Sequence, residues 1–346
     1  MLAEYGLFFA KVATFVVAVL LVIVAVASAS QRGADNEGHL EVKKINDRLS
    51  RMEDTLRAAV LDEHALKRHD KVEKQRLKQR DKEAKRCSAA DVPSRSVYVL
   101  DFDGDMKASA AESFREEVTA VLTLASANDE VVVRLESPGG MVHAYGFASS
   151  QLVRFKTAKV PLTVCVDKVA ASGGYMMACI ADKLLAAPFA VIGSIGVVAS
   201  LPNFNRVLKK HDVDYELLTA GEYKRTLTML GENTEAGRNK FIEDLQETHD
   251  LFKEFVAEYR PQLDIAEVAT GETWYGKKAQ EKALVDGIST SDEYITGQAA
   301  EASIYEVKFV QKKNWQEKLG LAAQAAIENS LGKLWSATSQ HWNSKH

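Results

Sequence analysis

From Ser96 onward, short runs of β-branched and aromatic residues alternate with longer segments of helical spacing. The runs are 96–104, 131–136, 162–166, 182–187 and 215–219, and the helical segments are 108–125, 144–159, 203–211 and 235–260. This alternation is typical of βαβ units, in which short parallel strands are buried between helices. The sequence therefore predicts an α/β domain.

The amino-terminal segment predicts a membrane anchor. Residues 12–29 are 18 consecutive uncharged, mostly apolar residues, just enough for a helix to cross a hydrocarbon core of about 30 Å. The alternative is a cleaved signal peptide, with the small residues at 27–30 as its cleavage site, but the apolar run exceeds the usual signal-peptide core. A retained anchor is the preferred interpretation. The apolar stretch at 186–201 is only 16 residues long and contains Pro188, Gly193 and Gly196, so we expect buried core there rather than a second span.

Residues 32–92 form a charged segment with its own pattern. Apolar residues recur in alternating steps of three and four, at Val42, Ile45, Leu49, Met52, Leu56 and Ala59. Residues 67–86 then carry ten Lys and Arg against four Asp and Glu. A solvated helical stalk is the preferred interpretation. Self-association through the heptad seam and contact of the basic run with anionic lipid headgroups are the alternatives.

Composition excludes several classes of protein. The chain has 44 basic and 48 acidic residues and a net charge of −4, which argues against a nucleic-acid binder. Its three cysteines, Cys87, Cys165 and Cys179, cannot form a disulfide framework, and no Cys-x-x-Cys or Cys/His cluster offers a metal site. We therefore expect no metal and no cofactor.

Three glycine-rich turns indicate where chemistry is possible: 137–140, 171–175 and 193–196. The first two follow predicted strands, and reactive groups gather at the carboxyl ends of parallel strands. Ser172, followed by two glycines, would lie at a strand-to-helix turn where the next backbone N–H can stabilise an oxyanion. The simpler interpretation is that Ala-Ser-Gly-Gly only makes a tight turn.

A nucleophilic serine needs a general base. Of the eight histidines, only His143 lies within the motif-rich core, and no aspartate is marked out to orient it. The other route is a lysine that loses its proton through burial. Lys224, in the sequence Gly-Glu-Tyr-Lys-Arg-Thr at 221–226, is such a candidate. A solvated loop lysine is the competing interpretation.

Five motifs in order carry a family resemblance: PGG at 138–140, ASGGY at 171–175, GSIGV at 193–197, GEYKR at 221–225, and TWYGKKA at 273–279 with LVDG at 284–287. Together they resemble the signal peptide peptidase A family of membrane serine proteases, peptidase family S49, and the anchor and stalk resemble its SohB branch. The resemblance implies the ClpP/crotonase-like ββα-superhelix fold and a Ser–Lys dyad.

The resemblance also assigns roles, residue by residue. Ser172 matches the nucleophile and Lys224 the general base, while Ser194 matches the serine that holds the lysine amine. Gly140 and Gly173 match the backbone donors of the oxyanion hole.

The family further implies a homo-oligomeric ring or dome, apolar peptide substrates such as signal-peptide remnants or misfolded envelope proteins, and an active site on the periplasmic face of the bacterial inner membrane. The positive-inside rule opposes that orientation, because Arg32, Lys43, Lys44 and Arg48 follow the apolar run. Members of this family can share the serine and lysine of one site between neighbouring subunits. The sequence leaves open whether that holds here.

The expected domains are an anchor at 1–31, a stalk at 32–92, a Ser–Lys protease domain at 93–300 with its motif core at 137–289, and an amphipathic carboxyl-terminal tail at 301–346. Two alternatives remain: a non-proteolytic acyl enzyme of the crotonase fold, and a catalytically silent membrane scaffold.

Overall fold

The computed structural model describes residues 38–62 and 95–311, with isolated positions at 14, 64, 68, 71, 75, 78 and 79. Apart from those positions, the expected span at 12–29, the basic run at 67–86 and the tail from residue 312 lie outside the described residues. Within the described part of the chain, no helix is both long and apolar enough to cross a bilayer.

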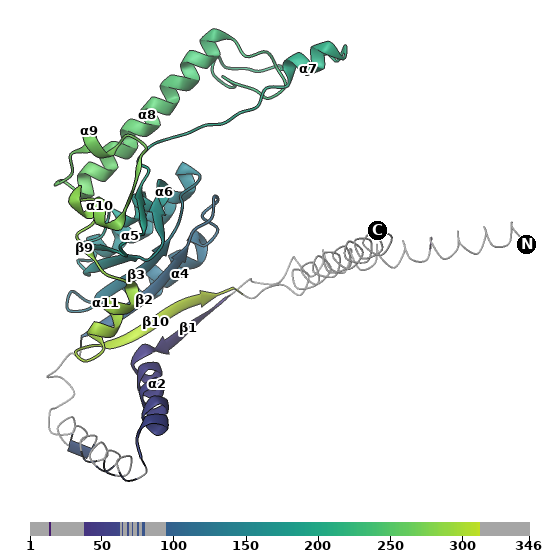
Figure 1. Ribbon diagram of the computed structural model, residues 1–346. Helices are drawn as coiled ribbons and strands as arrows, with labels where there is room; N and C mark the ends of the chain where they lie inside the picture. The colour runs from purple at the N-terminus through teal and green to yellow at the C-terminus, as the bar shows by residue number, and fades with distance from the viewer. Residues whose placement is uncertain are drawn as a thin grey trace, which may run out of the picture. The chain divides into compact units, whose positions relative to one another are not determined.

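A seven-stranded sheet is the centre of the described part of the chain (Figure 1). Its strand order is β1-β10-β2-β3-β4-β6-β9, and the neighbours from β10 to β9 pair in parallel. The bounds are β1 (His39–Lys44), β2 (Ser96–Asp103), β3 (Glu130–Glu136), β4 (Leu162–Val166), β6 (Lys183–Ala186), β9 (Gly287–Ile288) and β10 (Ser303–Val310). The predicted α/β class is confirmed, although β1, β9 and β10 were not predicted.

A smaller sheet joins β5 (Val169–Ala171), β7 (Val191–Gly193) and β8 (Thr273–Tyr275). β5 and β7 are parallel, and β7 and β8 are antiparallel. The helices are α2 (Ile45–Val60), α4 (Ala111–Leu122), α5 (Val142–Thr157), α6 (Gly173–Ala178), α7 (Asn205–Lys210), α8 (Glu235–Tyr259), α9 (Ile265–Val268), α10 (Gly276–Glu281) and α11 (Ser291–Gln298).

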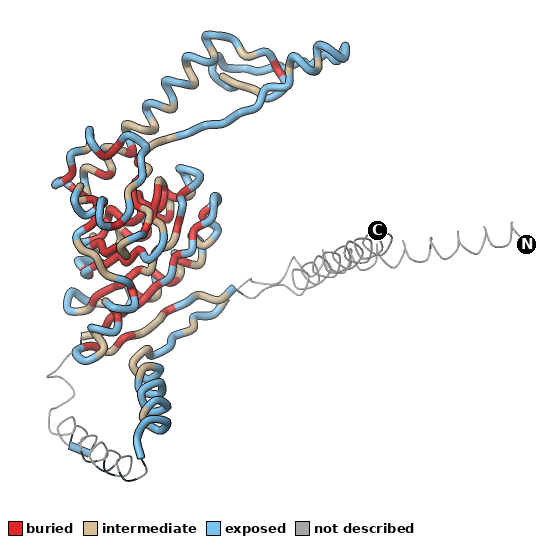
Figure 2. Tube along the Cα trace, viewed as in Figure 1, coloured by how far each residue is buried: buried red, intermediate tan, exposed pale blue. Residues whose placement is uncertain are grey.

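The central strands of the large sheet are buried on both faces, and their sequences show why. In β2, Leu100 faces the larger hydrophobic core with Phe114 of α4 and Leu152 of α5, whereas Val99 faces a second core with Ile295 of α11. Successive side chains of a strand point to opposite faces, so continuous apolar runs are what a sheet covered on both sides requires. Helices therefore pack on both faces of the central strands, and the centre of the domain is buried (red in Figure 2).

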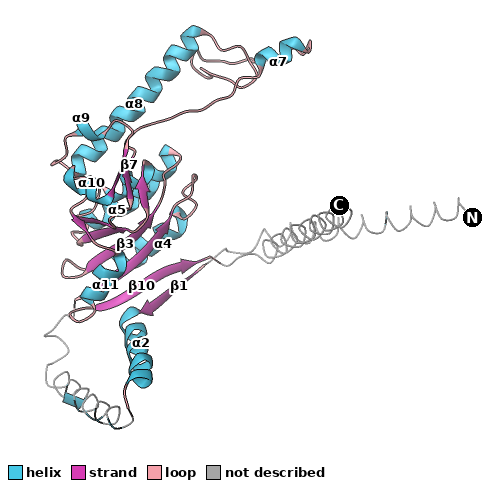
Figure 3. Ribbon diagram, in the orientation of Figure 1, coloured by secondary structure: helices cyan, strands magenta, loops and turns pink. Residues whose placement is uncertain are grey.

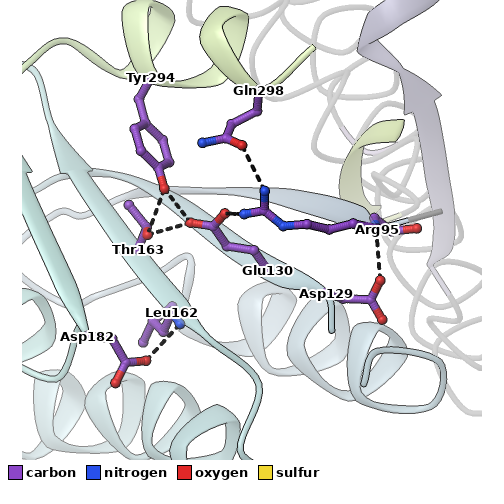
Figure 4. A network of polar contacts seen from close by, with 9 residues as sticks. Arg95, Asp129, Glu130, Leu162, Thr163, Asp182, Tyr294 and Gln298 are labelled. Carbon is purple, nitrogen blue, oxygen red and sulfur yellow. Dashed lines mark hydrogen bonds and ion pairs between the residues drawn. The ribbon is translucent and has the colours of Figure 1, made fainter. Parts of the chain in front are cut away.

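Polar side chains close the amino-terminal end of the central strands (Figure 4). Glu130, at the start of β3, is buried and accepts hydrogen bonds from Thr163 Oγ1 and Tyr294 OH, both at 2.6 Å, and pairs with Arg95. Arg95 also donates to Gln298 Oε1 at 3.0 Å. The Glu130 carboxylate thus has three donors, and the entry into β2 is fixed to β3 and α11.

The segment between β7 and α8, residues 198–234, is here called the arm. It extends from the sheet to the amino-terminal end of α8, and its only regular element is α7 (Figure 3). From Gly196 to Leu251, only Gly231 is buried.

The prediction of a strand at 215–219 is wrong, because these residues are exposed and pair with no strand of the described chain. The expectation of buried core at 186–201 holds for Ala186, Ala190, Ile192 and Ile195. It fails at Phe189 and Val198, which are 81% and 90% exposed.

Candidate active site

Ser172 lies where β5 ends and α6 begins, as the turn residues predicted. Its backbone has φ +52° and ψ −119°, a conformation that L-residues rarely adopt. The Ser172 N–H donates to the Gly193 carbonyl at 2.8 Å, and the Ser172 carbonyl accepts from Met176 N at 3.0 Å. Such a conformation costs on the order of 1–3 kcal/mol and is concentrated at functional sites. The surrounding hydrogen bonds therefore hold a half-buried serine in a strained turn.

The turn after β3 packs directly against Ser172, and only glycine fits there. Gly139 has φ +88°, and a Cβ on it would lie 2.7 Å from Gly173 N and 2.8 Å from Ser172 Cβ. A Cβ on Gly140 would lie 2.1 Å from the Met106 carbonyl oxygen. Both positions thus require the absence of a side chain, which lets two backbone segments approach each other at the serine.

Two backbone amides beside Ser172 are free to bind an acceptor. Within the described residues, neither the Gly140 N–H nor the Gly173 N–H donates a hydrogen bond to another group. Both glycines line a small cavity together with Ser172. Two free N–H groups beside a serine are the donors that an oxyanion hole needs.

The rest of the cavity is largely apolar. Its wall contains Val142 of α5, Met176 of α6, Val197, and Thr248 and Phe252 of α8. The two α8 residues could not be predicted from the sequence, because they lie more than about 75 residues beyond Ser172 and belong to no motif. The cavity is suited to an apolar side chain.

Ser194 lies at the end of β7, two residues before Gly196, which also lines the cavity. Its φ is +52°, and its N–H donates to the Glu272 carbonyl at 2.6 Å. A hydrogen bond connects the two strained serines, because Ser172 N donates to the carbonyl of Gly193, the residue directly before Ser194. The structure thus brings the ASGGY and GSIGV motifs together.

Lys224 is not brought to Ser172 within one copy of the chain. It is exposed in the arm, whose contacts are with the amino-terminal part of α8: Lys240 lies over the Tyr223 ring, and the Thr226 carbonyl contacts Gly237. The cavity residue Thr248 lies eight residues beyond Lys240, roughly 12 Å along the helix at 1.5 Å per residue. In the described part of the chain, no hydrogen bond joins Lys224 to Ser172.

The histidines are placed differently from the expectation. His143 is exposed in the first turn of α5, and its ring makes no hydrogen bond within the described residues. His249 of α8, which the sequence analysis set aside, has its Nε2 3.2 Å from the Ile195 carbonyl oxygen. It therefore fixes α8 to the turn that contains Ser194.

Other nucleophiles and ligand groups are less suitable. Cys165 and Cys179 are both buried, and burial raises the pKa of the Cys165 thiol to about 12, which keeps it protonated at neutral pH. Among the described residues, no group of three or more His, Cys, Asp and Glu could hold a metal ion.

Comparison with known proteins decides the family. Residues 1–152 match the family described as "Peptidase family S49 N-terminal", and residues 154–305 match "Peptidase family S49". The chain belongs to peptidase family S49. It is 48% identical to "Probable protease SohB" of Haemophilus influenzae over 95% of both chains, and 46% identical to "Probable protease SohB" of Buchnera aphidicola subsp. Schlechtendalia chinensis over 84% of this chain and 97% of the relative.

A more distant S49 relative is the "Putative signal peptide peptidase SppA" of Enterococcus faecium, 27% identical over 53% of this chain and 54% of the relative. Membership and the long matches to SohB proteases make the chain a peptidase. The site described above spans both matched regions, because Gly140 lies in the first and Ser172, Gly173 and Ser194 lie in the second.

Proposed function

We propose that the chain is a membrane-anchored serine endopeptidase with a ClpP/crotonase-like protease domain, Ser172 as its nucleophile and Lys224 as its general base. The observation that carries the proposal is the strained Ser172 turn, with the free amides of Gly140 and Gly173 in the same cavity. Ser194, at the adjoining turn, would hold the lysine amine through its hydroxyl.

The reaction follows from these roles. The neutral Lys224 amine removes the proton from Ser172 Oγ, which attacks the peptide carbonyl carbon. The carbonyl oxygen becomes an oxyanion that accepts hydrogen bonds from the Gly140 and Gly173 amides. The lysine then gives the proton to the leaving amine, and water hydrolyses the acyl-enzyme by the same sequence of proton transfers.

Lys224 would reach Ser172 of a neighbouring copy. Within one copy the arm exposes apolar side chains, among them Val198 at 90%, Leu218 at 89% and Tyr223 at 59%. Large exposed apolar patches mark interaction surfaces. Contact of the arm with a second copy would bury these groups, and a lysine serves as a base only where burial favours its neutral amine. A homo-oligomeric ring or dome would satisfy both requirements.

The substrates we propose are apolar peptides, such as signal-peptide remnants and misfolded membrane or envelope proteins. The apolar cavity beside Ser172 supports this class, as does the relative named a putative signal peptide peptidase. We assign residues 1–31 to an inner-membrane anchor, 32–92 to a stalk and 93–300 to the protease domain on the periplasmic face. The basic residues after the anchor argue against that orientation. β10 (Ser303–Val310) pairs with β2 of that domain, so the carboxyl-terminal tail that we expected at 301–346 would begin only after this strand.

The test is hydrolysis of a fluorogenic peptide with an apolar residue before the scissile bond, by the full chain in detergent. Ser172→Ala and Lys224→Ala should each abolish cleavage, while Lys210→Ala, an exposed lysine of the same arm, should cleave at the wild-type rate. Gel filtration checks that each variant assembles as the wild type does.

Two further outcomes refine the dyad. Co-assembling Ser172→Ala with Lys224→Ala should restore part of the activity if the serine and lysine come from different copies, because some sites then combine an intact serine with an intact lysine. Full activity of both single variants would overturn the dyad and make His143 the next base to test.

A further inference from the structure

We propose that Tyr145 is a positioning residue that sets the relative positions of the two oxyanion-hole amides, those of Gly140 and Gly173. The inference rests on the proposed function of the Ser172 site. It comes from a buried side chain that belongs to none of the sequence motifs and yet supports both halves of that site.

Tyr145 of α5 is completely buried, and its ring forms the surface on which Gly173 packs. A Cβ on Gly173 would lie 2.4 Å from Tyr145 Cγ. The ring is itself held by an edge contact with Phe102 of β2, with centroids 6.3 Å apart. The position of the Gly173 backbone therefore depends on the Tyr145 ring.

The hydroxyl of the same tyrosine supports the other amide through Ser137. Tyr145 OH donates to the Asp105 carbonyl at 2.7 Å and lies 2.6 Å from Ser137 Oγ. Ser137 Oγ accepts a hydrogen bond from Gly139 N at 3.1 Å. Because the phenol proton goes to the carbonyl, Ser137 must donate to the phenol oxygen. Gly139 N–H thus donates to Ser137 Oγ, Ser137 O–H donates to the Tyr145 oxygen, and Tyr145 O–H donates to the Asp105 carbonyl. Each of these three protons is used in a hydrogen bond.

This chain of hydrogen bonds lies where the backbone segments of the site meet. The Ser137 N–H donates to the Val169 carbonyl and the Ser137 carbonyl accepts from Ala171 N, which joins the turn to the strand that carries Ser172. On the other side, Met141 N donates to the Met106 carbonyl at 2.9 Å, next to Gly140. Loss of the phenol hydroxyl would release the Asp105 and Ser137 contacts together.

Burial raises the pKa of the Tyr145 phenol above its ordinary value, so the hydroxyl remains a donor throughout the working range of pH. Phe at this position keeps the ring under Gly173 and removes only the hydroxyl. The substitution Tyr145→Phe therefore separates the two contributions, and Ser137→Ala removes the other member of the chain.

The experiment measures kcat, KM and thermal stability of full-length Tyr145→Phe, Ser137→Ala and the double variant on the fluorogenic peptide. It also measures inhibition by a peptide aldehyde, whose hemiacetal oxygen occupies an oxyanion hole. A misplaced oxyanion donor acts mainly on the transition state, so we expect kcat to fall about tenfold and KM to change less than about twofold. The aldehyde should bind about tenfold more weakly, in step with kcat.

Because the two residues act as one unit, the double variant should be no slower than the slower single variant. The control is Tyr294→Phe, which removes a phenol hydrogen bond of 2.6 Å to Glu130 at the opposite end of the strands. It should lower stability and leave kcat and aldehyde affinity unchanged.

A Tyr145→Phe variant with wild-type kcat and aldehyde affinity, or one that loses only stability as the control does, would overturn the inference while Ser172→Ala remains inactive. If Ser172→Ala cleaves at the wild-type rate, the proposed function fails and this inference fails with it.

Discussion

The two ends of β3, together with the segments packed beside each end, are built in opposite ways. At the amino-terminal end, Glu130 is buried with three donors on its carboxylate. At the carboxyl-terminal end, Ser172 is strained and the Gly140 and Gly173 amides have no acceptor among the described residues. Gly140 is exposed but Gly173 is buried, and buried polar groups are almost always paired in folded proteins, so the free Gly173 amide needs an explanation.

The difference between the two ends indicates that one contributes to stability and the other to function. The amino-terminal end shows how this chain satisfies polar groups when nothing else is required of them. The carboxyl-terminal end keeps donors free at the edge where parallel sheets place their reactive groups. The variants of Gly140 and Glu130 below each break one end and leave the other intact.

Breaking the carboxyl-terminal end at Gly140 should have the largest effect. In Gly140→Ala, the new Cβ would lie 2.1 Å from the Met106 carbonyl oxygen, so the turn must move and its amide with it. Loss of one oxyanion donor costs about 3–4 kcal/mol in the transition state, so kcat should fall at least about a hundredfold. Steady-state peptide hydrolysis measures this.

The matched control is Gly146→Ala in α5, where a Cβ meets no atom within 4 Å. Helix propensity favours Ala over Gly by about 0.5–1 kcal/mol, so this variant should be as active as the wild type and slightly more stable. Equal activity loss in both variants would show that the turn has no special role.

Breaking the amino-terminal end should affect stability instead. Glu130→Ala leaves Arg95, Thr163 and Tyr294 without their shared acceptor. Removing one partner of a buried ion pair costs about 3–5 kcal/mol, and we expect the free energy of unfolding to fall by about 3 kcal/mol. Urea unfolding measures this change, and kcat per folded molecule should stay at the wild-type value.

Glu136→Ala, at the other end of β3, is the control for that loss. Its partner Lys168 is 72% exposed, and exposed ion pairs contribute at most about 1 kcal/mol. A loss as large as that of Glu130→Ala would mean that charge on β3, rather than the shared acceptor, determines stability.

A second buried glutamate sharpens the comparison, because its carboxylate is only half satisfied. Glu117 of α4 accepts from Phe309 N at 2.8 Å through Oε1, and its Oε2 has no hydrogen-bond partner among the described residues. Burial, opposed by that N–H and by Lys308 and assisted by Asp101, raises the pKa of Glu117 from 4.5 to about 7. The folded state then holds the proton more tightly than the unfolded chain does.

The sign follows from that difference. Between about pH 4.5 and 7, the folded state keeps the Glu117 proton and the unfolded chain loses it. The contribution of this proton to the free energy of unfolding is therefore fully present below about pH 4.5 and is lost as the pH rises through about 7. With partial solvent screening, the loss between pH 4.5 and 8 should be about 2 kcal/mol. Glu117→Gln is neutral at every pH and should abolish this slope in urea unfolding. An unchanged slope would mean that other groups cause it.

The sequence predicted what local rules determine. The glycine-rich turns fix the positions of Ser172 and Ser194 because small residues are required where backbones approach. The strand runs at 96–104 and 131–136 match β2 and β3 because they are apolar on both faces. The arm could not be predicted in the same way: residues 215–219 have strand composition but pair with no strand in the described chain. Tyr145 and Phe252 belong to no motif. Their contribution to the site comes from tertiary packing, which the sequence alone does not show.

The smallest expected effect concerns the cavity wall contributed by α8. Thr248 lines the cavity beside Ser172, and its hydroxyl already donates to the Asp244 carbonyl at 2.8 Å, so the methyl group is free to face the cavity. Thr248→Ala enlarges the cavity, and a size change of about one methyl group in an apolar pocket is worth about 1 kcal/mol. The ratio of kcat/KM for a bulky over a small apolar residue before the scissile bond should therefore rise about fivefold. Glu247→Ala, its exposed neighbour on the helix, should leave that ratio unchanged. If both variants change the ratio equally, the effect comes from a shift of the whole helix α8 and not from the Thr248 methyl group in the cavity wall.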